Sequence, residues 1–333
     1  MSETPIAVLG AGSWGTALAI AIANRPGNRV VLWGRDPRQM ETIRRRRENA
    51  AFLPGIRLPE TIRPSADLAE AAGAEAILMV VPSGGLRETA EQLAAIGTGA
   101  TLISCTKGIE RGSGLRMSEI LARIVPGSPV AVLSGPSHAE EVARGMPTAL
   151  VLGCAREAVA ARWQAAITSP TFRVYTSTDV PGIELGGALK NVFAIAAGLG
   201  DGLGFGDNTK AALVTRALGE LIRVGMAMGG RSETFHGLSG VGDLMVTCFS
   251  RHSRNRKVGE ALGRGDRSLE AIMESMTMVA EGVPTTLAAW ECARQHGLTT
   301  PVIDAVHALL YLGKTPQEIL EEVLTREPKP EIG

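Results

Sequence analysis

The sequence predicts an α/β domain over residues 1–182, followed by an all-helical domain over residues 183–333. Two patterns support this division. Up to Tyr175, short β-branched runs alternate with helical runs, as in a parallel sheet whose strands are joined by helices. The first of these runs leads directly into a G-x-G-x-x-G sequence, whereas the chain after residue 183 is helical in composition. The two halves are therefore expected to be built differently.

The composition is that of an ordinary globular protein. The 333 residues are 45% hydrophobic and 20% charged, which suits two folded cores. Lysine plus arginine and aspartate plus glutamate both number 34, so no net charge favours nucleic acid or an acidic membrane as partner. The four cysteines lack a C-x-x-C pair and lack histidines at ligand spacing. We therefore expect neither disulfides nor a metal site.

Nothing in the sequence indicates export or membrane insertion. The N-terminal residues M-S-E-T-P lack the basic segment and the cleavage site of a signal peptide. The apolar run Ala17–Ala23 is too short to cross a bilayer. We expect a cytoplasmic protein.

The first predicted strand, Ile6–Leu9, is followed by Gly10, Gly12 and Gly15 and then by a helical run. Gly10 permits a tight turn, Gly12 lets the backbone approach a pyrophosphate, and Gly15 lets the helix pack on the strand. Free N–H groups at the start of the helix would face the phosphates. The stretch predicts a dinucleotide-binding site.

The second predicted strand, Arg29–Trp33, ends in Gly34-Arg35-Asp36. An acidic residue in this region typically holds the ribose 2′-hydroxyl of NAD, whereas an arginine accommodates a 2′-phosphate. Arg35 favours NADP(H). Asp36 leaves NAD(H) open as the alternative.

Three further buried runs end in polar or glycine residues, namely Ala76–Val81, Thr101–Ser104 and Val130–Leu133. Each of these ends lies at the carboxyl edge of a parallel sheet, where ligands bind. Pro82-Ser83 follows the first run, Lys107 the second, and the loop of residues 134–139 the third. The remaining predictions before the helical half are strands at Leu150–Leu152 and Phe172–Tyr175, with a helix at 155–168 between them.

The helical half begins with an apolar helix, Ile183–Gly198, which carries a single amine at Lys190. Small residues on several faces of this helix would let neighbouring backbones approach. Burial of an ammonium lowers its pKa, which suits a base working near neutral pH. The alternative is a lysine that extends its charged end to solvent from a half-buried helix.

After a helical run at Ala211–Met228, two segments contain candidate functional residues. Residues 237–244 are glycine-rich and contain Asp243, and Ser253-Arg254-Asn255 open a helix. Several donors at a helix start form an anion site. The alternative is that these residues form only a basic helix cap without a ligand. The last predicted helices are Ser268–Glu274, Thr285–Arg294 and Pro316–Arg326, the last capped by Thr315.

Elimination leaves a lysine as the general base. The sequence has no Tyr-x-x-x-Lys and no Cys/His set for a catalytic zinc, and its five histidines are scattered without an obvious partner. Lys190 is the candidate base and Lys107 a second cation, and in a shared site their repulsion would lower the pKa of at least one. Asp243 would orient the amine. Arg254 would hold an anionic end of the substrate, helped by Ser253 and Asn255.

Six segments together closely resemble bacterial-type NAD(P)-dependent glycerol-3-phosphate dehydrogenases: G-A-G-S-W-G-T-A-L, C-T-K-G-I-E, L-S-G-P-S-H-A-E-E-V, E-L-G-G-A-L-K-N-V-F-A-I, L-S-G-V-G-D-L-M-V-T-C and S-R-N-R. The resemblance implies a Rossmann-like domain and a helical domain like that of 6-phosphogluconate dehydrogenase, often in a homodimer. It implies reversible reduction of dihydroxyacetone phosphate to sn-glycerol 3-phosphate, which supplies phospholipid synthesis.

The resemblance also implies roles for individual residues. Lys190 matches the family's proton acceptor, with Lys107 and Asp243 beside it. The substrate contacts of the family match Lys107, Gly135, Ser137, Asp243, Ser253, Arg254 and Asn255. The cofactor contacts match Ser13, Trp14, Arg35, Lys107, Ala139, Arg254, Val279 and Glu281, in addition to the three glycines. Gly34 departs from the family, in which many members carry a basic residue there, so the chain has one donor fewer for a 2′-phosphate.

Two other hypotheses about the function stay open. A β-hydroxyacid or ketopantoate-type reductase combines similar domains with a lysine, but its substrate ends in a carboxylate, and the dense S-R-N-R donors favour a phosphate. A protein that senses NADPH without turnover would have no need of Lys190, Asp243 and Arg254 together.

Overall fold

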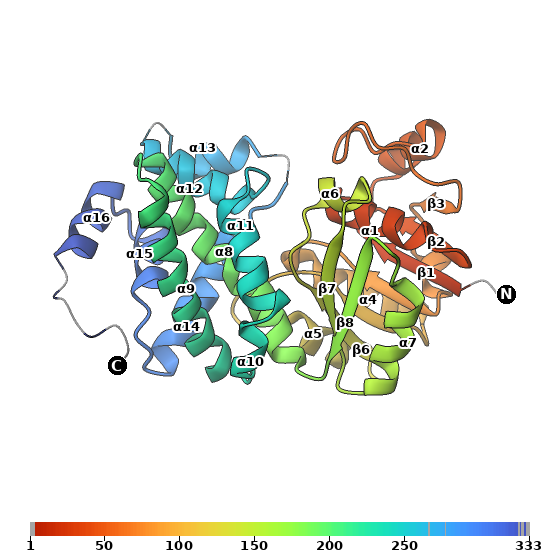
Figure 1. Cartoon of the computed structure of the whole chain (residues 1–333). Helices are drawn as coiled ribbons and strands as arrows, with labels where there is room; N and C mark the ends of the chain where they lie inside the picture. The colour runs from red at the N-terminus through yellow and green to blue at the C-terminus, as the bar shows by residue number, and fades with distance from the viewer. Residues whose placement is uncertain (1–3, 266, 277, 326, 328–329, 331–333) are drawn as a thin grey trace.

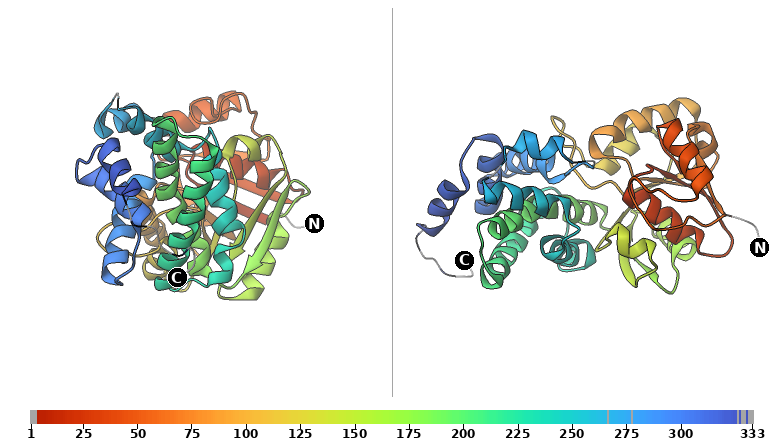
Figure 2. Two further views of the ribbon diagram at one scale, coloured as in Figure 1. Left: turned by 60° about the vertical axis from the view of Figure 1, so that its left-hand side comes forward. Right: turned by 90° about the horizontal axis from the view of Figure 1, so that it is seen from above.

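The computed structural model describes residues 4–265, 267–276, 278–325, 327 and 330. Figure 1 shows a sheet with flanking helices on the right and a helical half on the left. The right-hand view of Figure 2, from above, shows the same separation of the sheet from the later helices. The predicted fold class is confirmed.

The eight strands form one sheet in the order β3-β2-β1-β4-β5-β6-β7-β8. Every predicted strand is present, and an additional short strand, β3, lies at the end of the loop before Ala66. The polar strand ends predicted from sequence follow β4, β5 and β6. The strands are β1 Thr4–Leu9, β2 Asn28–Trp33, β3 Ile62–Ser65, β4 Ala76–Met79, β5 Thr101–Ser104, β6 Val130–Ser134, β7 Thr148–Gly153 and β8 Phe172–Ser177.

The direction of β7 was not predicted. β7 runs antiparallel to β6, with Val132 opposite Gly153, whereas the other neighbouring strands pair in parallel. The helix between β6 and β7 is α6, Ala139–Ala143, of 5 residues. Such a helix spans about 7 Å, whereas a strand of five residues such as β6 spans about 16 Å. It is therefore too short to carry the chain back along the sheet.

Helices cover both faces of the sheet. One apolar cluster packs α1, α2, α6 and α7 against one face, and a second packs α3, α4 and α5 against the other. The sheet reverses its strand order between β1 and β4, which is where ligands bind in open sheets. The remaining helices of this half are α1 Ser13–Ala23, α2 Pro37–Arg46, α3 Leu68–Ala72, the 3₁₀ turn η1 Ser83–Gly85, α4 Leu86–Ile96, α5 Met117–Ile124 and α7 Glu157–Ile167.

The helical half is built around α8, Val180–Gly202. This helix begins three residues before the predicted Ile183, because Asp179 caps it by accepting a hydrogen bond from Gly182 N and Pro181 occupies its first turn. It is long and apolar enough to cross a membrane, but 94% of its apolar window is buried inside the fold. Its length and hydropathy are thus those of a core helix.

The later helices pack around α8. The helices predicted at 211–228, 268–274 and 285–294 are present, and Thr315 caps the last helix as predicted, although Arg326 at its predicted end lies outside the described residues. The elements are α9 Asp207–Ala227, α10 Ser232–Phe235, the π-helical turn η2 Leu238–Gly242, α11 Asp243–Phe249, α12 Arg254–Arg264, α13 Leu269–Glu274, α14 Gly282–Gln295, α15 Pro301–Tyr311 and α16 Pro316–Leu324.

Glycines let α8 and α12 approach until their backbones touch. A Cβ on Gly259 would lie 1.9 Å from Ile195 O, and a Cβ on Gly198 would lie 1.9 Å from Arg256 O. No side chain fits between the helices at these points. The close approach places the start of α12, with Ser253 to Asn255, beside α8.

We expect Gly259→Ala to lower the free energy of unfolding by about 3 kcal/mol, since the methyl group must separate two backbones. A urea titration measures this change. Gly219→Ala is the matched control, because the nearest atom to its added Cβ is the end of the Arg223 side chain at 3.4 Å. The control should gain up to about 1 kcal/mol from helix propensity. Equal stability of the Gly259→Ala protein and the wild type would contradict the packing described here.

Candidate active site

The site centres on three charged side chains from three separate elements. Lys190 comes from α8, Asp243 is the first residue of α11, and Lys107 lies in the loop after β5. Lys190 Nζ donates to Asp243 Oδ1, and Lys107 Nζ donates to Oδ2 of the same carboxylate at 2.6 Å. Asp243 is fully buried and Lys190 is 7% exposed. One carboxylate thus holds two ammonium groups at the junction of the two halves.

Two neighbouring groups complete this arrangement. Lys190 Nζ also donates to Thr247 Oγ1 at 2.7 Å, and Thr247 Oγ1 donates to Asp243 O, one helical turn earlier, at 2.6 Å. Lys107 Nζ additionally lies 3.3 Å from Gly135 O in the loop after β6. Thr247 was not predicted from the sequence. Its spacing of four residues from Asp243 on one helix is the signal in the sequence that could have identified it.

Glycines on α8 bring these groups together. A Cβ on Gly186 would lie 2.3 Å from Ser239 O in η2, and a Cβ on Gly187 would lie 2.4 Å from Ser134 Oγ at the end of β6. The turn that leads into Asp243 and the strand end beside Lys107 therefore both pack directly on the α8 backbone. The small residues around Lys190 have the role expected from the sequence.

Burial lowers the pKa of Lys190 to about 7. The carboxylate of Asp243 opposes this change by favouring the ammonium, whereas the charge of Lys107 adds to it. The lysine is therefore buried and does not extend its amine to solvent. An amine that titrates near neutral pH can both donate and accept a proton, as a reversible reaction requires.

The start of α12 is hydrogen-bonded to α8 at Asn191, the residue after Lys190. Ser253 caps the helix by accepting from Arg256 N at 3.2 Å. Asn255 Nδ2 donates to Asn191 Oδ1 at 2.9 Å, and Asn255 Oδ1 accepts from Gly282 N at 2.8 Å. These bonds tie α12 to α8 next to Lys190 and to the first residue of α14.

The two arginines of S-R-N-R differ in their surroundings. Arg256 forms ion pairs with Asp201 and Glu260. Arg254 donates to Val279 O at 2.8 Å. Burial lowers the pKa of Arg254 below its usual value, and the carboxylate of Glu281 partly opposes this effect. Among the described residues, Arg254 has no carboxylate within ion-pair distance, so its charge remains available to a ligand.

The glycine-rich turn has the geometry that a dinucleotide requires. Gly10 has φ +125°, and a Cβ on it would lie 2.5 Å from Val80 O. A Cβ on Gly15 would lie 1.8 Å from Gly10 O, whereas no atom lies within 4 Å of a Cβ on Gly12. Gly12 therefore borders open space at the start of α1, where no side chain caps the first N–H groups. These donors fit a pyrophosphate.

Arg35 and Asp36 follow β2, outside the Lys190 cluster. Asp36 caps α2 by accepting from Arg38 N at 2.9 Å, so its carboxylate is already engaged. Arg35 is exposed and has no ion-pair partner among the described residues. Gly34 is buried, and a Cβ there would lie 2.5 Å from Met40 Sδ, so a larger residue at this position would require the Met40 side chain to move.

A segment of the helical half reaches the dinucleotide-binding edge. Ser13 Oγ lies 3.5 Å from Met278 Sδ, and Glu281 accepts hydrogen bonds from Ser83 N, at 3.0 Å, and from Ser83 Oγ. Burial raises the pKa of Glu281, and the bonds from Ser83 oppose this. The structure thus brings Val279 and Glu281 to the same edge as Ser13, Trp14 and Ala139. Ser83 was noted as a strand end, but its partner was not predicted.

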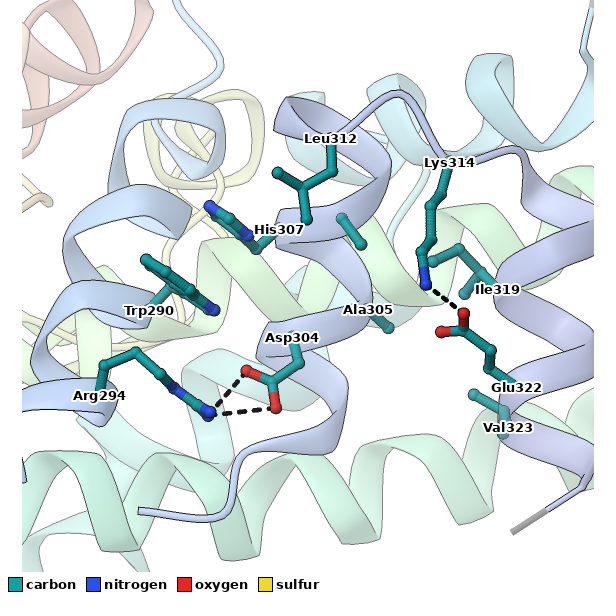
Figure 3. A pocket seen from close by; sticks show the side chains of 11 residues that line it. Trp290, Arg294, Asp304, Ala305, His307, Leu312, Lys314, Ile319, Glu322 and Val323 are labelled. Atoms are coloured by element: carbon teal, nitrogen blue, oxygen red, sulfur yellow. Dashed lines mark hydrogen bonds and ion pairs between the residues drawn. The ribbon is translucent and has the colours of Figure 1, made fainter. Parts of the chain in front are cut away.

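Two of the ring contacts in the structure involve histidines for which the sequence showed no obvious partner. The rings of His138 and His252 lie 5.6 Å apart, and His307 stacks on Trp290 at 4.1 Å. The latter pair lines a cavity of about 230 Å³ between α14, α15 and α16 (Figure 3). The charged groups around that cavity pair with one another, Arg294 with Asp304 and Lys314 with Glu322. None of the predicted site residues lines it.

Known proteins resemble this chain over nearly its whole length. Two family models match, described as the N-terminus and the C-terminus of NAD-dependent glycerol-3-phosphate dehydrogenase, over residues 5–160 and 179–321. A protein of Desulfitobacterium hafniense named glycerol-3-phosphate dehydrogenase (NAD(P)+) is 47% identical over 98% of this chain and 93% of its own. One of the same name from Moorella thermoacetica is 48% identical over 98% and 97%. A crystal structure of glycerol-3-phosphate dehydrogenase from Coxiella burnetii superposes with a TM-score of 0.92, at 37% identity, over 97% and 99%.

Proposed function

This chain belongs to the NAD-dependent glycerol-3-phosphate dehydrogenase family, and we propose that it catalyses reversible reduction of dihydroxyacetone phosphate to sn-glycerol 3-phosphate with Lys190 as general acid and base. The observation that carries the mechanism is the buried Lys190 amine bound to Asp243 and Thr247. The dinucleotide supplies or receives the hydride. The chain's own residues move the proton.

Lys190 has one N–H left for the substrate. An ammonium group carries three donors, and two of them are used by Asp243 and Thr247. The third is free to donate to a carbonyl oxygen while hydride reaches its carbon. In the oxidation direction, the neutral amine accepts the hydroxyl proton instead. Lys107 contributes a second positive charge close to the oxygen on which negative charge develops.

The phosphate of the substrate would bind at the start of α12. Arg254 offers a guanidinium that has no carboxylate within ion-pair distance among the described residues, and the first turn of α12 offers backbone N–H groups. The hydrogen bonds of Asn255 to Asn191 and Gly282 hold this region against α8. The distance between phosphate and reacting carbon is then fixed by the packing of α12 on α8.

NADP(H) is the proposed preferred cofactor, because Arg35 has no ion-pair partner among the described residues and Asp36 is engaged as a helix cap. We expect Arg35→Ala to weaken NADPH binding about tenfold or more, while NADH binding changes less than about twofold. Fluorescence titration with each nucleotide measures both effects. Arg45→Ala, an exposed arginine in the last turn of α2, is the control and should bind both nucleotides as the wild type does. Equal losses with the two nucleotides would show that Arg35 does not contact the 2′-phosphate.

The assignment of substrate is tested by following NADPH consumption with dihydroxyacetone phosphate and with ketopantoate in parallel. Oxidation of NADPH only with the triose phosphate supports the proposal. Turnover of ketopantoate alone would favour the reductase alternative, and tight NADPH binding without turnover would favour a sensor.

The cellular setting is part of the same proposal. We place the protein in the cytoplasm as a homodimer that supplies glycerol 3-phosphate to phospholipid synthesis. Light scattering after size-exclusion chromatography tests the dimer. A single peak at the mass of one 34.9 kDa chain would contradict it.

A further inference from the structure

Two histidines from the two halves of the molecule meet beside the proposed phosphate site. His138 precedes α6 in the loop after β6, and His252 lies in the loop between α11 and α12. Their ring centroids are 5.6 Å apart and the rings are tilted by 50°. In sequence, His138 directly follows Ser137, and His252 directly precedes Ser253 and Arg254. Each histidine of the pair is therefore a direct sequence neighbour of a proposed substrate contact.

The ring nitrogens of this pair are largely unused. His138 Nε2 lies 3.4 Å from Val246 O, on the turn of α11 that presents Thr247 to Lys190. A carbonyl oxygen only accepts, so this bond places the proton of a neutral ring on Nε2 and leaves Nδ1 able to take up another. Among the described residues, no hydrogen-bond partner is found for His138 Nδ1 or for either ring nitrogen of His252. His138 is half-buried and His252 is exposed.

The charged groups around His138 disfavour its protonation in the free protein. Burial and the charge of Lys190 on α8 lower the pKa of His138, whereas Val246 O and Glu141 on α6 oppose them, and His252 adds a small lowering effect. Cationic neighbours thus outweigh the single carboxylate. An anion bound here would reverse this balance, because it would favour a positive charge on the rings.

We infer that His138 and His252 are further substrate-binding residues, which contact the phosphate beside Arg254 and become protonated as it binds. A phosphate dianion supplies both the negative charge and the acceptor oxygens that two imidazolium rings require. The pair would then also hold the two halves of the molecule together around the substrate. This inference rests on the proposed function for the identity of the phosphate.

The test compares KM for dihydroxyacetone phosphate, at saturating NADPH, between pH 6 and pH 9 in the wild type and in His138→Gln and His252→Gln. At pH 6 each variant should show a KM about tenfold above that of the wild type, because a charge-assisted hydrogen bond is lost. The KM values should converge above pH 8, where histidine side chains are ordinarily neutral. kcat should stay within about twofold at all pH values. KM–pH curves that superimpose on the wild-type curve would overturn the inference.

Two controls separate this role from a structural one. His296→Gln removes a histidine at the end of α14, where Nδ1 contacts Cys292 O, and should leave KM unchanged at every pH. Calorimetry of sn-glycerol 3-phosphate binding to the NADPH complex, in two buffers of different ionisation enthalpy, counts protons directly. The wild type should take up more protons than His252→Gln, and equal uptake would overturn the inference.

Failure of the proposed function can be distinguished from failure of the inference about the two histidines. If the wild type does not turn over dihydroxyacetone phosphate, the proposed substrate is wrong. The same calorimetry with inorganic phosphate then tests whether His138 and His252 bind a phosphate. Proton uptake that disappears in His252→Gln supports a phosphate site at the pair. Uptake that is the same in both proteins rejects it.

Discussion

Lys190→Ala should lower kcat by about 10³-fold, within the range that a positioned general acid or base contributes. NADPH affinity should stay within about twofold of the wild type, because Lys190 lies on α8 and not at the glycine-rich turn. The fold should persist, since Asp243 keeps its ion pair with Lys107. Single-turnover measurements with dihydroxyacetone phosphate and a nucleotide titration separate the two effects.

A lysine outside the site provides the control for this result. Lys314 pairs with Glu322 at the cavity in Figure 3, and Lys314→Ala should have wild-type kinetics. A small primary amine added to Lys190→Ala should restore part of the lost rate, because it can occupy the vacated volume and carry the proton. Turnover like that of the wild type in Lys190→Ala would exclude Lys190 as the acid and base.

Asp243→Asn should lower kcat about 10²-fold and move the pH dependence. Asp243 raises the pKa of Lys190 against the effect of burial, so its loss should lower that pKa below about 7. In the oxidation direction, where the neutral amine is required, the rise of activity with pH should then occur at lower pH. In the reduction direction, where the ammonium is required, activity should begin to fall at lower pH. Rates measured in both directions from pH 5 to pH 9 test this.

A second carboxylate provides a matched control for this substitution. Asp201 also holds two cations, Lys210 and Arg256, at the far end of α8. Asp201→Asn should therefore cost stability, as loss of a partly buried pair does, but should leave the pH dependence of the rate where it is in the wild type. If both substitutions move the pH dependence equally, Asp243 has no specific influence on Lys190.

Local sequence patterns were sufficient to predict much of the fold of the sheet-containing half. The glycine-rich turn follows from steric requirements within six residues, and the buried strands follow from unbroken apolar runs. The carboxyl ends of parallel strands share one edge, so Lys107 and the loop of residues 134–139 were predicted to lie on the same edge of the sheet. The antiparallel direction of β7 depends on the shortness of α6, which the residue pattern did not reveal.

The contacts that complete the site join residues far apart in the chain. Thr247 and Lys190 are 57 positions apart, Ser83 and Glu281 are 198, and Asn255 and Asn191 are 64. No periodicity or spacing encodes such pairs, because they depend on how α8 packs against η2, α11 and α12. The sequence identified Lys190 as an amine on an apolar helix. Only the packing shows that the Lys190 amine is buried against the hydroxyl of Thr247 and the carboxylate of Asp243.

The pH dependence of kcat/KM for oxidation of sn-glycerol 3-phosphate tests the central claim most directly. For the free enzyme, kcat/KM should rise with pH below about pH 7 and stop rising above it, as Lys190 loses its proton. In the reduction direction, kcat/KM should be level below about pH 7 and fall above it. A rate that does not change between pH 6 and pH 8 in either direction would contradict proton transfer by Lys190.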